Sequence, residues 1–236
     1  MKSILKKLLL GKISNLERPK YNPIQKRIQN IRSIWNNDHQ DDNGIEKIIR
    51  LFLSSSQLLF PGIYLKFLAN KKGVEYEDLA LDFYVLLKVA FPTLILMNHW
   101  QNNTWLVWVL FYVFLETVLY IPTLIFASDS FSKPRSYKRS MLLLFFNYLE
   151  ISFTYAVFYS CDSYLNKPFT HWFDAVYFSI ITSSSIGYGD YFPVTTIGKF
   201  LVSTQALLFL FFIVLFLNFF STKIKSKGYF DHKNQD

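Results

Sequence analysis

The chain has 236 residues, 51% of them hydrophobic and 19% aromatic, and its 25 lysines and arginines against 17 acidic residues give a formal net charge of +8. Apolar runs of about 20 residues are too long for the helices of an ordinary soluble domain and predict a protein that crosses a membrane several times. The single cysteine, Cys161, excludes an intrachain disulfide and a zinc site built from cysteine pairs.

Residues 1–44 predict a basic amphipathic arm on the cytoplasmic side, ending in an acidic linker. The first residues do not form a signal peptide, because Lys12 breaks the leucine run and no small-residue cleavage site follows. Two apolar stripes have helical spacing: Ile4, Leu5, Leu8, Leu9, Ile13 and Leu16, and then Ile24, Ile28, Ile31 and Trp35. We expect these helices either to bind anionic lipid at the inner leaflet or to pack between subunits. The linker, residues 38–44, is not a calcium loop, since Arg50 occupies the position of the required glutamate.

Residues 45–75 predict an interfacial helical segment. The stretch is apolar but contains three serines, Lys66 and a Pro61-Gly62 pair, where we expect a bend. A fifth membrane span here would place the arm outside, although nine of the first 32 residues are basic and only Glu17 is acidic. The interfacial interpretation is therefore preferred.

Four apolar windows predict membrane spans, at residues 82–98, 104–127, 141–160 and 196–220. Two front helices and a basic linker occupy residues 76–140, a second pair occupies residues 141–222, and residues 223–236 form a short tail. Basic residues gather in the 128–140 connector and in the tail, so both chain ends are predicted to be cytoplasmic. We expect a multi-pass protein of the plasma or inner membrane.

Three ionisable residues fall within these spans: Lys88, Glu116 and Glu150. Such groups cost about 2.5 to 3.5 kcal/mol each at the centre of a membrane helix and normally face protein or water. We expect Lys88 to pair with one of the glutamates and so to couple the front helices to the last two spans. The alternative is that Lys88 reaches the interface and that the glutamates bond to neighbours such as Asn147.

The connector between the last two spans predicts a re-entrant segment, FDAVYFSIITSSSIGYGDYFP at residues 173–193. Asp174 suits the N-terminus of a short helix, which we expect to end near Ser184. Non-helical backbone at membrane depth is tolerated where it lines a cavity or is buried in protein. The alternate glycines Gly187 and Gly189 permit a backbone whose successive carbonyls point to one side and replace the hydration shell of a monovalent cation.

The run Ser185-Ile186-Gly187-Tyr188-Gly189-Asp190 resembles the Thr-Val-Gly-Tyr-Gly-Asp selectivity filter of tetrameric potassium channels. The resemblance extends over a helix, a pore loop and a helix, roughly residues 141–220, about a third of the chain. It implies an all-α membrane protein with four transmembrane helices, one re-entrant pore helix and a filter, assembled as a tetramer. It also implies potassium ligands: the hydroxyl of Ser185 and the backbone carbonyls of Ile186, Gly187, Tyr188 and Gly189.

The same resemblance implies roles for residues around the filter. Tyr177 and Phe178 would pack around it, with Tyr177 bonded to Asp190, and Phe192 would bind tetraethylammonium at the outer mouth. The last span would line the pore, with Gly198 at a common family glycine and Phe209 where many members carry a hinge glycine. One face of this span is apolar and consists of Leu210, Ile213, Val214 and Leu217. These side chains either line the cavity and form a gate that closes by dewetting or face lipid.

These observations predict a homotetrameric potassium channel subunit, with K⁺ as the permeant ion and no cofactor. No helix repeats a basic residue at every third position, so a conventional voltage sensor is not expected. Enzyme chemistry is not predicted, because the sequence carries no nucleophile elbow, metal-ligand cluster or phosphate loop, and no nucleic-acid signature accompanies the basic arm. The alternatives are a channel-related transporter subunit and a non-conducting membrane protein that binds partners and has a vestigial pore.

Overall fold

The computed structural model describes residues 21–38, 42–127 and 137–224, and these residues form helices and connecting loops without a β-strand. The helices are α2 (Pro23–Asn36), α3 (Gly44–Ser56), α4 (Pro61–Lys72), α5 (Val74–Met97), α6 (Thr104–Phe126), α7 (Tyr137–Ser160), α8 (Trp172–Ser183) and α9 (Thr196–Ile224). Two short 3₁₀ turns are η1 (Gln57–Leu59) and η2 (Trp100–Asn102). The first apolar stripe of the arm, part of the acidic linker, most of the basic connector and the end of the tail lie outside these residues.

Four helices are long and apolar enough to cross a membrane, and they confirm the predicted all-α membrane fold. The spans are Tyr76–Met97, Thr104–Phe126, Lys138–Ser160 and Thr196–Asn218. The first span begins at Tyr76, earlier than the predicted residue 82. The acidic residues at the start of α5 remain helical because they form ion pairs with α7. Arg139 of α7 pairs with Asp78 at 3.0 Å and with Asp82 at 2.6 Å.

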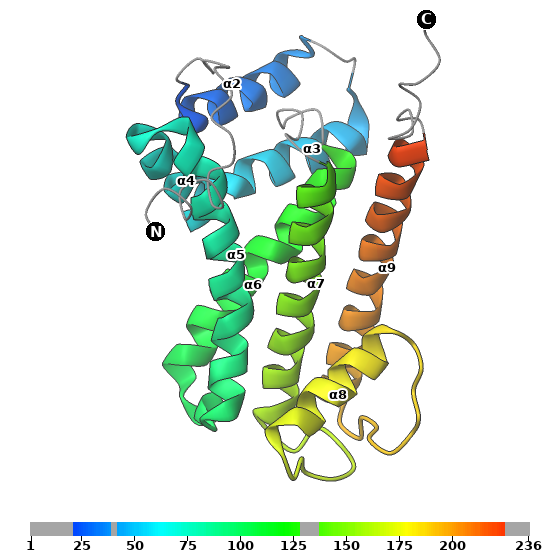
Figure 1. Ribbon diagram of the computed structural model, residues 1–236. Helices are drawn as coiled ribbons and strands as arrows, with labels where there is room; N and C mark the ends of the chain where they lie inside the picture. The colour runs from blue at the N-terminus through cyan, green and yellow to red at the C-terminus, as the bar shows by residue number, and fades with distance from the viewer. Residues whose placement is uncertain (1–20, 39–41, 128–136, 225–236) are drawn as a thin grey trace, which may run out of the picture.

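The long helix α7 lies at the centre of the bundle. Figure 1 shows α5, α6 and α7 running together, α9 beside α7, and the short helix α8 set obliquely at one end. The main apolar core joins Leu144, Ile151 and Tyr155 of α7 to Phe212 and Leu215 of α9. The last described turn of α9 and the N-terminal helices lie at the end opposite α8 (Figure 1).

The N-terminal helices α2, α3 and α4 form a bent segment at that opposite end. The chain bends by 61° between Gly44–Leu59 and Pro61–Lys72, at the Pro-Gly pair. Tyr21, before α2, donates a hydrogen bond to Glu77 Oε1 at 2.9 Å, and Lys66 Nζ lies 2.9 Å from the same oxygen. Since Glu77 is in the first turn of α5, the segment starts and finishes at the same end of the bundle.

Helix α2 carries the second apolar stripe of the arm. The Asn22 side chain caps it by accepting from the Ile24 amide at 3.0 Å, and Asn37 ends it in the left-handed conformation. Ile28 and Trp35 of the stripe are exposed, Ile24 and Ile31 are partly buried, and the neighbouring Ile34 is buried. About half of the stripe is therefore open to its surroundings.

The first turn of α9 packs tightly against the loop that follows α7. The Val194 amide donates to Tyr164 O at 3.0 Å, which holds the chain entering α9 against this loop. A Cβ on Gly198 would lie 2.8 Å from Tyr164 O and 3.2 Å from Thr195 Oγ1. A larger residue at this position must push the backbone of the loop away.

We predict that Gly198→Ala lowers the free energy of unfolding by about 1 to 3 kcal/mol, because a methyl group there overpacks against backbone. The measurement is the thermal unfolding midpoint of the detergent-solubilised protein. Ser203→Ala, on the exposed face of the same helix, is the control and should leave the midpoint unchanged. Equal midpoints for the two variants would contradict the prediction.

Candidate ion pore

A network of hydrogen bonds fixes the start of the pore helix α8. Asp174 Oδ2 accepts from the amide of Thr170 at 3.0 Å, from its hydroxyl at 2.7 Å and from the amide of His171 at 3.0 Å. His171 in turn accepts from the Phe173 amide at 3.2 Å through Nδ1. These bonds satisfy amides that the first turn of a helix leaves free, so the predicted helix start is present.

The same bonds lower the pKa of Asp174, with the Thr170 hydroxyl as the largest cause and the His171 amide next. A carboxyl group with a lowered pKa in the folded state stabilises that state above its ordinary pKa. The contribution disappears as the pH falls through the lowered value. The helix start therefore depends on an ionised Asp174.

We predict that Asp174→Asn lowers the thermal midpoint at neutral pH, because the amide loses the charge and accepts fewer of these bonds. The difference between the wild type and the variant should shrink as the pH falls below 3.8, the ordinary pKa of the group. Thermal unfolding across a pH series measures this. A difference that does not change with pH would contradict the role of the ionised carboxylate.

The C-terminal end of α8 closes with a Schellman motif whose left-handed residue is Ser185. The Ile186 amide donates to Ile181 O at 3.0 Å, and the Ser185 amide donates to Thr182 O at 3.2 Å. Ser185 has φ +58°, the conformation that glycine usually supplies at this position of the motif. The first predicted potassium ligand is thus also the left-handed residue that terminates this motif, and α8 itself ends at Ser183, within one residue of the predicted end at Ser184.

Positive φ values alternate along the predicted filter. Ser185, Gly187 and Gly189 have φ +58°, +56° and +84°. A Cβ on either glycine would meet no atom of this chain within 4 Å, so backbone conformation rather than crowding requires glycine there. The side chains of Ile186 and Tyr188 are 54% and 71% exposed in the single chain. The rest of this chain therefore does not cover the predicted filter segment.

The two predicted support residues lie in different surroundings. The ring of Tyr177 stacks on Tyr188 of the filter, with centroids 6.5 Å apart and planes 5° from parallel. Desolvation, and next the nearby Asp190 carboxylate, raise the pKa of Tyr177. Phe178 is buried in the core and packs edge-on to Tyr159 of α7 at 4.8 Å, so it contacts the bundle rather than the filter of its own chain.

Asn166 holds the loop that leaves the filter. The Asn166 side-chain Oδ1 accepts from the backbone amide of Phe192 at 2.9 Å, and the backbone amide of Asn166 donates to Phe192 O at 3.0 Å. Its Nδ2 also donates to Asp190 O at 3.3 Å. Phe192, the predicted outer-mouth residue, is half exposed. Nothing local in the sequence singles out Asn166, because its partners are more than 20 residues away.

The predicted gate residues share the exposed side of α9, facing away from the core of their own chain. Leu210, Val214 and Leu217 are all more than half exposed, and Ile213 is 38% exposed. The opposite side of α9 buries Gln205, Phe212 and Leu215. Phe209, at the position of the family hinge glycine, packs against the Tyr148 ring at 5.9 Å.

The structure brings together the three ionisable residues of the spans. Lys88 Nζ lies 3.7 Å from Glu116 Oε2 and 3.9 Å from Glu150 Oε2, and it donates a hydrogen bond to Thr117 Oγ1. Lys88, Glu116 and Glu150 are each less than 10% exposed. Glu150 is fully buried, and its ion pair with Lys88 compensates for the burial of its charge. The cluster joins α5, α6 and α7.

The bend of the N-terminal segment is seated on this cluster. The Gly62 amide donates to Glu116 Oε1 at 3.1 Å, and Tyr112 of α6 donates to Leu59 O at 2.6 Å. Glu116 lies roughly 15 Å from the end of α6 at 1.5 Å per residue. The bend thus contacts the middle of a membrane span, and an unbroken series of contacts links it through Glu116 and Lys88 to α7.

A double-mutant cycle tests the seating of the bend. A Cβ on Gly62 would lie 2.6 Å from Glu116 Oε1, so Gly62→Ala should lower the free energy of unfolding by about 1 to 3 kcal/mol. In the Glu116→Ala background, which leaves Lys88 and Glu150 charge-balanced, the same change should cost much less. Thermal or denaturant unfolding of the four proteins gives the coupling energy. Additive effects would show that the clash does not exist.

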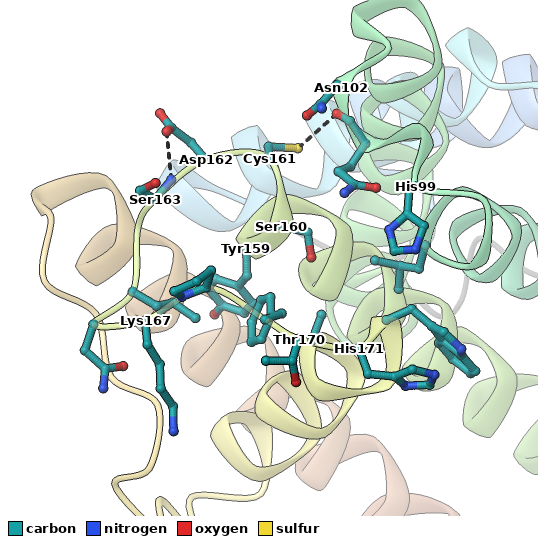
Figure 2. Close-up of a pocket in the computed structure, with 18 residues that line it drawn as sticks. His99, Asn102, Tyr159, Ser160, Cys161, Asp162, Ser163, Lys167, Thr170 and His171 are labelled. Atoms are coloured by element: carbon teal, nitrogen blue, oxygen red, sulfur yellow. Dashed lines mark hydrogen bonds between the residues drawn. The ribbon is translucent and has the colours of Figure 1, made fainter.

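A cavity of about 590 Å³ lies at the α8 end of the bundle, beside the start of α8. Figure 2 shows His99 and Asn102 from the α5–α6 turn on one side and Thr170 and His171 on another, with the end of α7 between them. The Cys161 thiol donates to Gln101 O there at 3.7 Å. Among the described residues, no group of three or more His, Cys, Asp or Glu side chains is placed to hold a metal ion.

Residues 143–226 match a protein-family model described as an ion channel. The match begins in α7 and includes the pore helix, the filter segment and α9. No curated protein and no solved structure shows significant similarity to the chain. The prediction of an ion channel module in the last third of the chain is therefore confirmed, and this module belongs to a membrane protein with several apolar helices.

Sequence reasoning did not single out Gln205, a buried polar residue of this module. It is 1% exposed in the middle of α9. A polar amide inside an apolar span is the same signal that singled out Lys88 and the two glutamates, and it would have identified this residue.

Proposed function

We propose that the protein is a subunit of a potassium-selective channel, in which four copies of the chain surround one axis and residues 185–189 form the filter. The observation that carries the proposal is the alternation of positive φ at Ser185, Gly187 and Gly189. Alternating backbone conformations turn successive carbonyls toward the same side. A ring of such carbonyls from each of four chains replaces the water around a potassium ion.

The tetramer is proposed from what one chain leaves exposed. The filter residues Ile186 and Tyr188 and the apolar side of α9 are open in the single chain. Apolar surface at such positions is stable when it faces lipid or another chain. In a tetramer, neighbouring chains cover the filter edges, and the side of α9 that carries Leu210, Ile213, Val214 and Leu217 lines the inner cavity and closes by dewetting.

The remaining chain supplies anchoring and control. The Lys88, Glu116 and Glu150 cluster couples the bent N-terminal segment to α7, so that movement of the segment reaches the pore. The basic arm binds anionic lipid on the cytoplasmic side, where both chain ends lie. At the outer mouth, Phe192 from each chain binds tetraethylammonium through its ring face.

The test is the reversal potential of the purified protein in a bilayer, with potassium on one side and sodium on the other. The wild type should reverse close to the potassium equilibrium potential. Gly187→Ala should abolish this selectivity, because an L-residue pays about 1 to 2 kcal/mol in the left-handed region and the filter backbone must change.

Gly44→Ala is the matched control. Gly44 has φ +57°, nearly the same as Gly187, and equally open space around its Cβ position, but it lies at the start of α3. Gly44→Ala should keep the wild-type reversal potential. A wild-type protein that conducts without preferring potassium, or that carries no current in the presence of anionic lipid, would overturn the proposed function.

A further inference from the structure

The amide of Gln205 joins three helices in the interior of the pore module. Its Nε2 donates to Ser179 O at 2.9 Å and to Ser179 Oγ at 2.7 Å, both in α8. Its Oε1 accepts from the Tyr159 hydroxyl of α7 at 2.8 Å. Every hydrogen-bonding atom of the Gln205 side chain is therefore occupied.

Ser179 extends this network to α7. Its hydroxyl donates to Ser152 O at 2.6 Å while it accepts from Gln205. Gln205, Ser179, Tyr159 and Ser152 are all 0 to 1% exposed. Polar groups buried this deeply have no water to replace a lost partner, so the network favours one arrangement of the three helices.

The position of Ser179 connects this network to the filter. Ser179 is in the middle of α8, six residues before Ser185, and Ser183 in the last turn of α8 bonds to the Tyr148 hydroxyl at 2.8 Å. The helix start is held by the Asp174 network, which is exposed to solvent. Gln205 of α9 bonds directly to Ser179 of α8, and a shift of α9 therefore acts directly on the helix that carries the proposed filter.

We propose that Gln205 is a positioning residue for the filter, which keeps the pore helix in the place where the filter selects potassium. The proposal rests on the potassium-channel function proposed above. Gln205 touches no ion and acts through Ser179 and the backbone of α8. The role requires a side chain of this length that both donates and accepts, because Gln205 donates to Ser179 of α8 while it accepts from the Tyr159 hydroxyl of α7.

The neighbouring residue provides a matched control. Thr204 accepts a hydrogen bond from the Tyr155 hydroxyl at 3.0 Å, which links α9 to α7 without touching α8. Thr204→Val removes this bond and nearly preserves the side-chain shape. It therefore reports what the loss of one hydrogen bond between α7 and α9 does to the channel when the pore helix keeps its own partners.

The experiment compares the wild type, Gln205→Leu and Thr204→Val as purified, assembled protein in bilayers with potassium and sodium on opposite sides. We expect Gln205→Leu to lower the potassium-to-sodium permeability ratio about tenfold or more, because it leaves the buried Tyr159 hydroxyl without its acceptor and removes the hydrogen bonds that tie α8 to α9. Thr204→Val should keep the wild-type ratio. Native gel electrophoresis confirms that each variant assembles.

A conservative variant separates positioning from packing. In Gln205→Glu at about pH 5, a protonated carboxyl group donates to Ser179 O and accepts from Tyr159, so selectivity should be retained. Tyr159 ordinarily titrates near pH 10 and does not change charge under these conditions. If Gln205→Leu does not assemble, Gln205→Asn replaces it, since the shorter amide cannot span both partners and should show the same loss.

A selective wild type with an equally selective Gln205→Leu, or Gln205→Asn in its place, would overturn the positioning role and leave the proposed function intact. Loss of selectivity in Gln205→Glu at about pH 5, equal to the loss in Gln205→Leu, would also overturn it, because the hydrogen bonds would then not be the cause. A wild type that does not select potassium would overturn the proposed function and the inference together.

Discussion

The structure depends on how a short helix and a non-helical loop are held in a membrane protein, where buried polar groups have no water to complete their hydrogen bonds. Helix α8 has 12 residues and is fastened along its whole length. Asp174 accepts from the amides before its first turn, Ser179 bonds to α7 and α9 in its middle, and a Schellman motif closes its end. The conformation of the proposed filter segment follows from this arrangement, because that segment starts at Ser185, the left-handed residue of the motif.

The front helices α5 and α6 contact helix α7 of the channel module through ion pairs at two positions along the bundle. At the end of the bundle opposite α8, Arg139 pairs with Asp78 and Asp82, and these partly exposed ion pairs fix where α7 begins beside α5. In the middle of the bundle, Lys88 bridges the carboxylates of two other helices in a buried site. Buried ion pairs are costly to separate once formed, so α5, α6 and α7 behave as one unit, and the bent N-terminal segment rests on that unit through Gly62.

Much of this arrangement could be predicted from the sequence, and the limits of prediction have physical causes. Apolar runs of membrane length identified the four spans, and the charge of Asp174 identified the start of the pore helix, because both signals are local. The contact of Gly62 with Glu116 and the role of Asn166 were missed, since each depends on residues distant in the chain. The start of the first span was predicted too late, at residue 82, because Asp78 looks like a loop residue until Arg139 is placed beside it.

Ser185 has two tasks that favour different side chains. As the left-handed residue of the Schellman motif, with φ +58°, it occupies a position that glycine fills at the lowest conformational cost. As the proposed innermost ligand, it must carry an oxygen on its side chain, which glycine cannot provide. Serine satisfies both requirements in part: its left-handed backbone conformation is less favourable than that of glycine, but its side chain provides the hydroxyl group. Replacements at this position should therefore divide into those that disturb the helix end and those that remove a ligand, and glycine belongs to the second group alone.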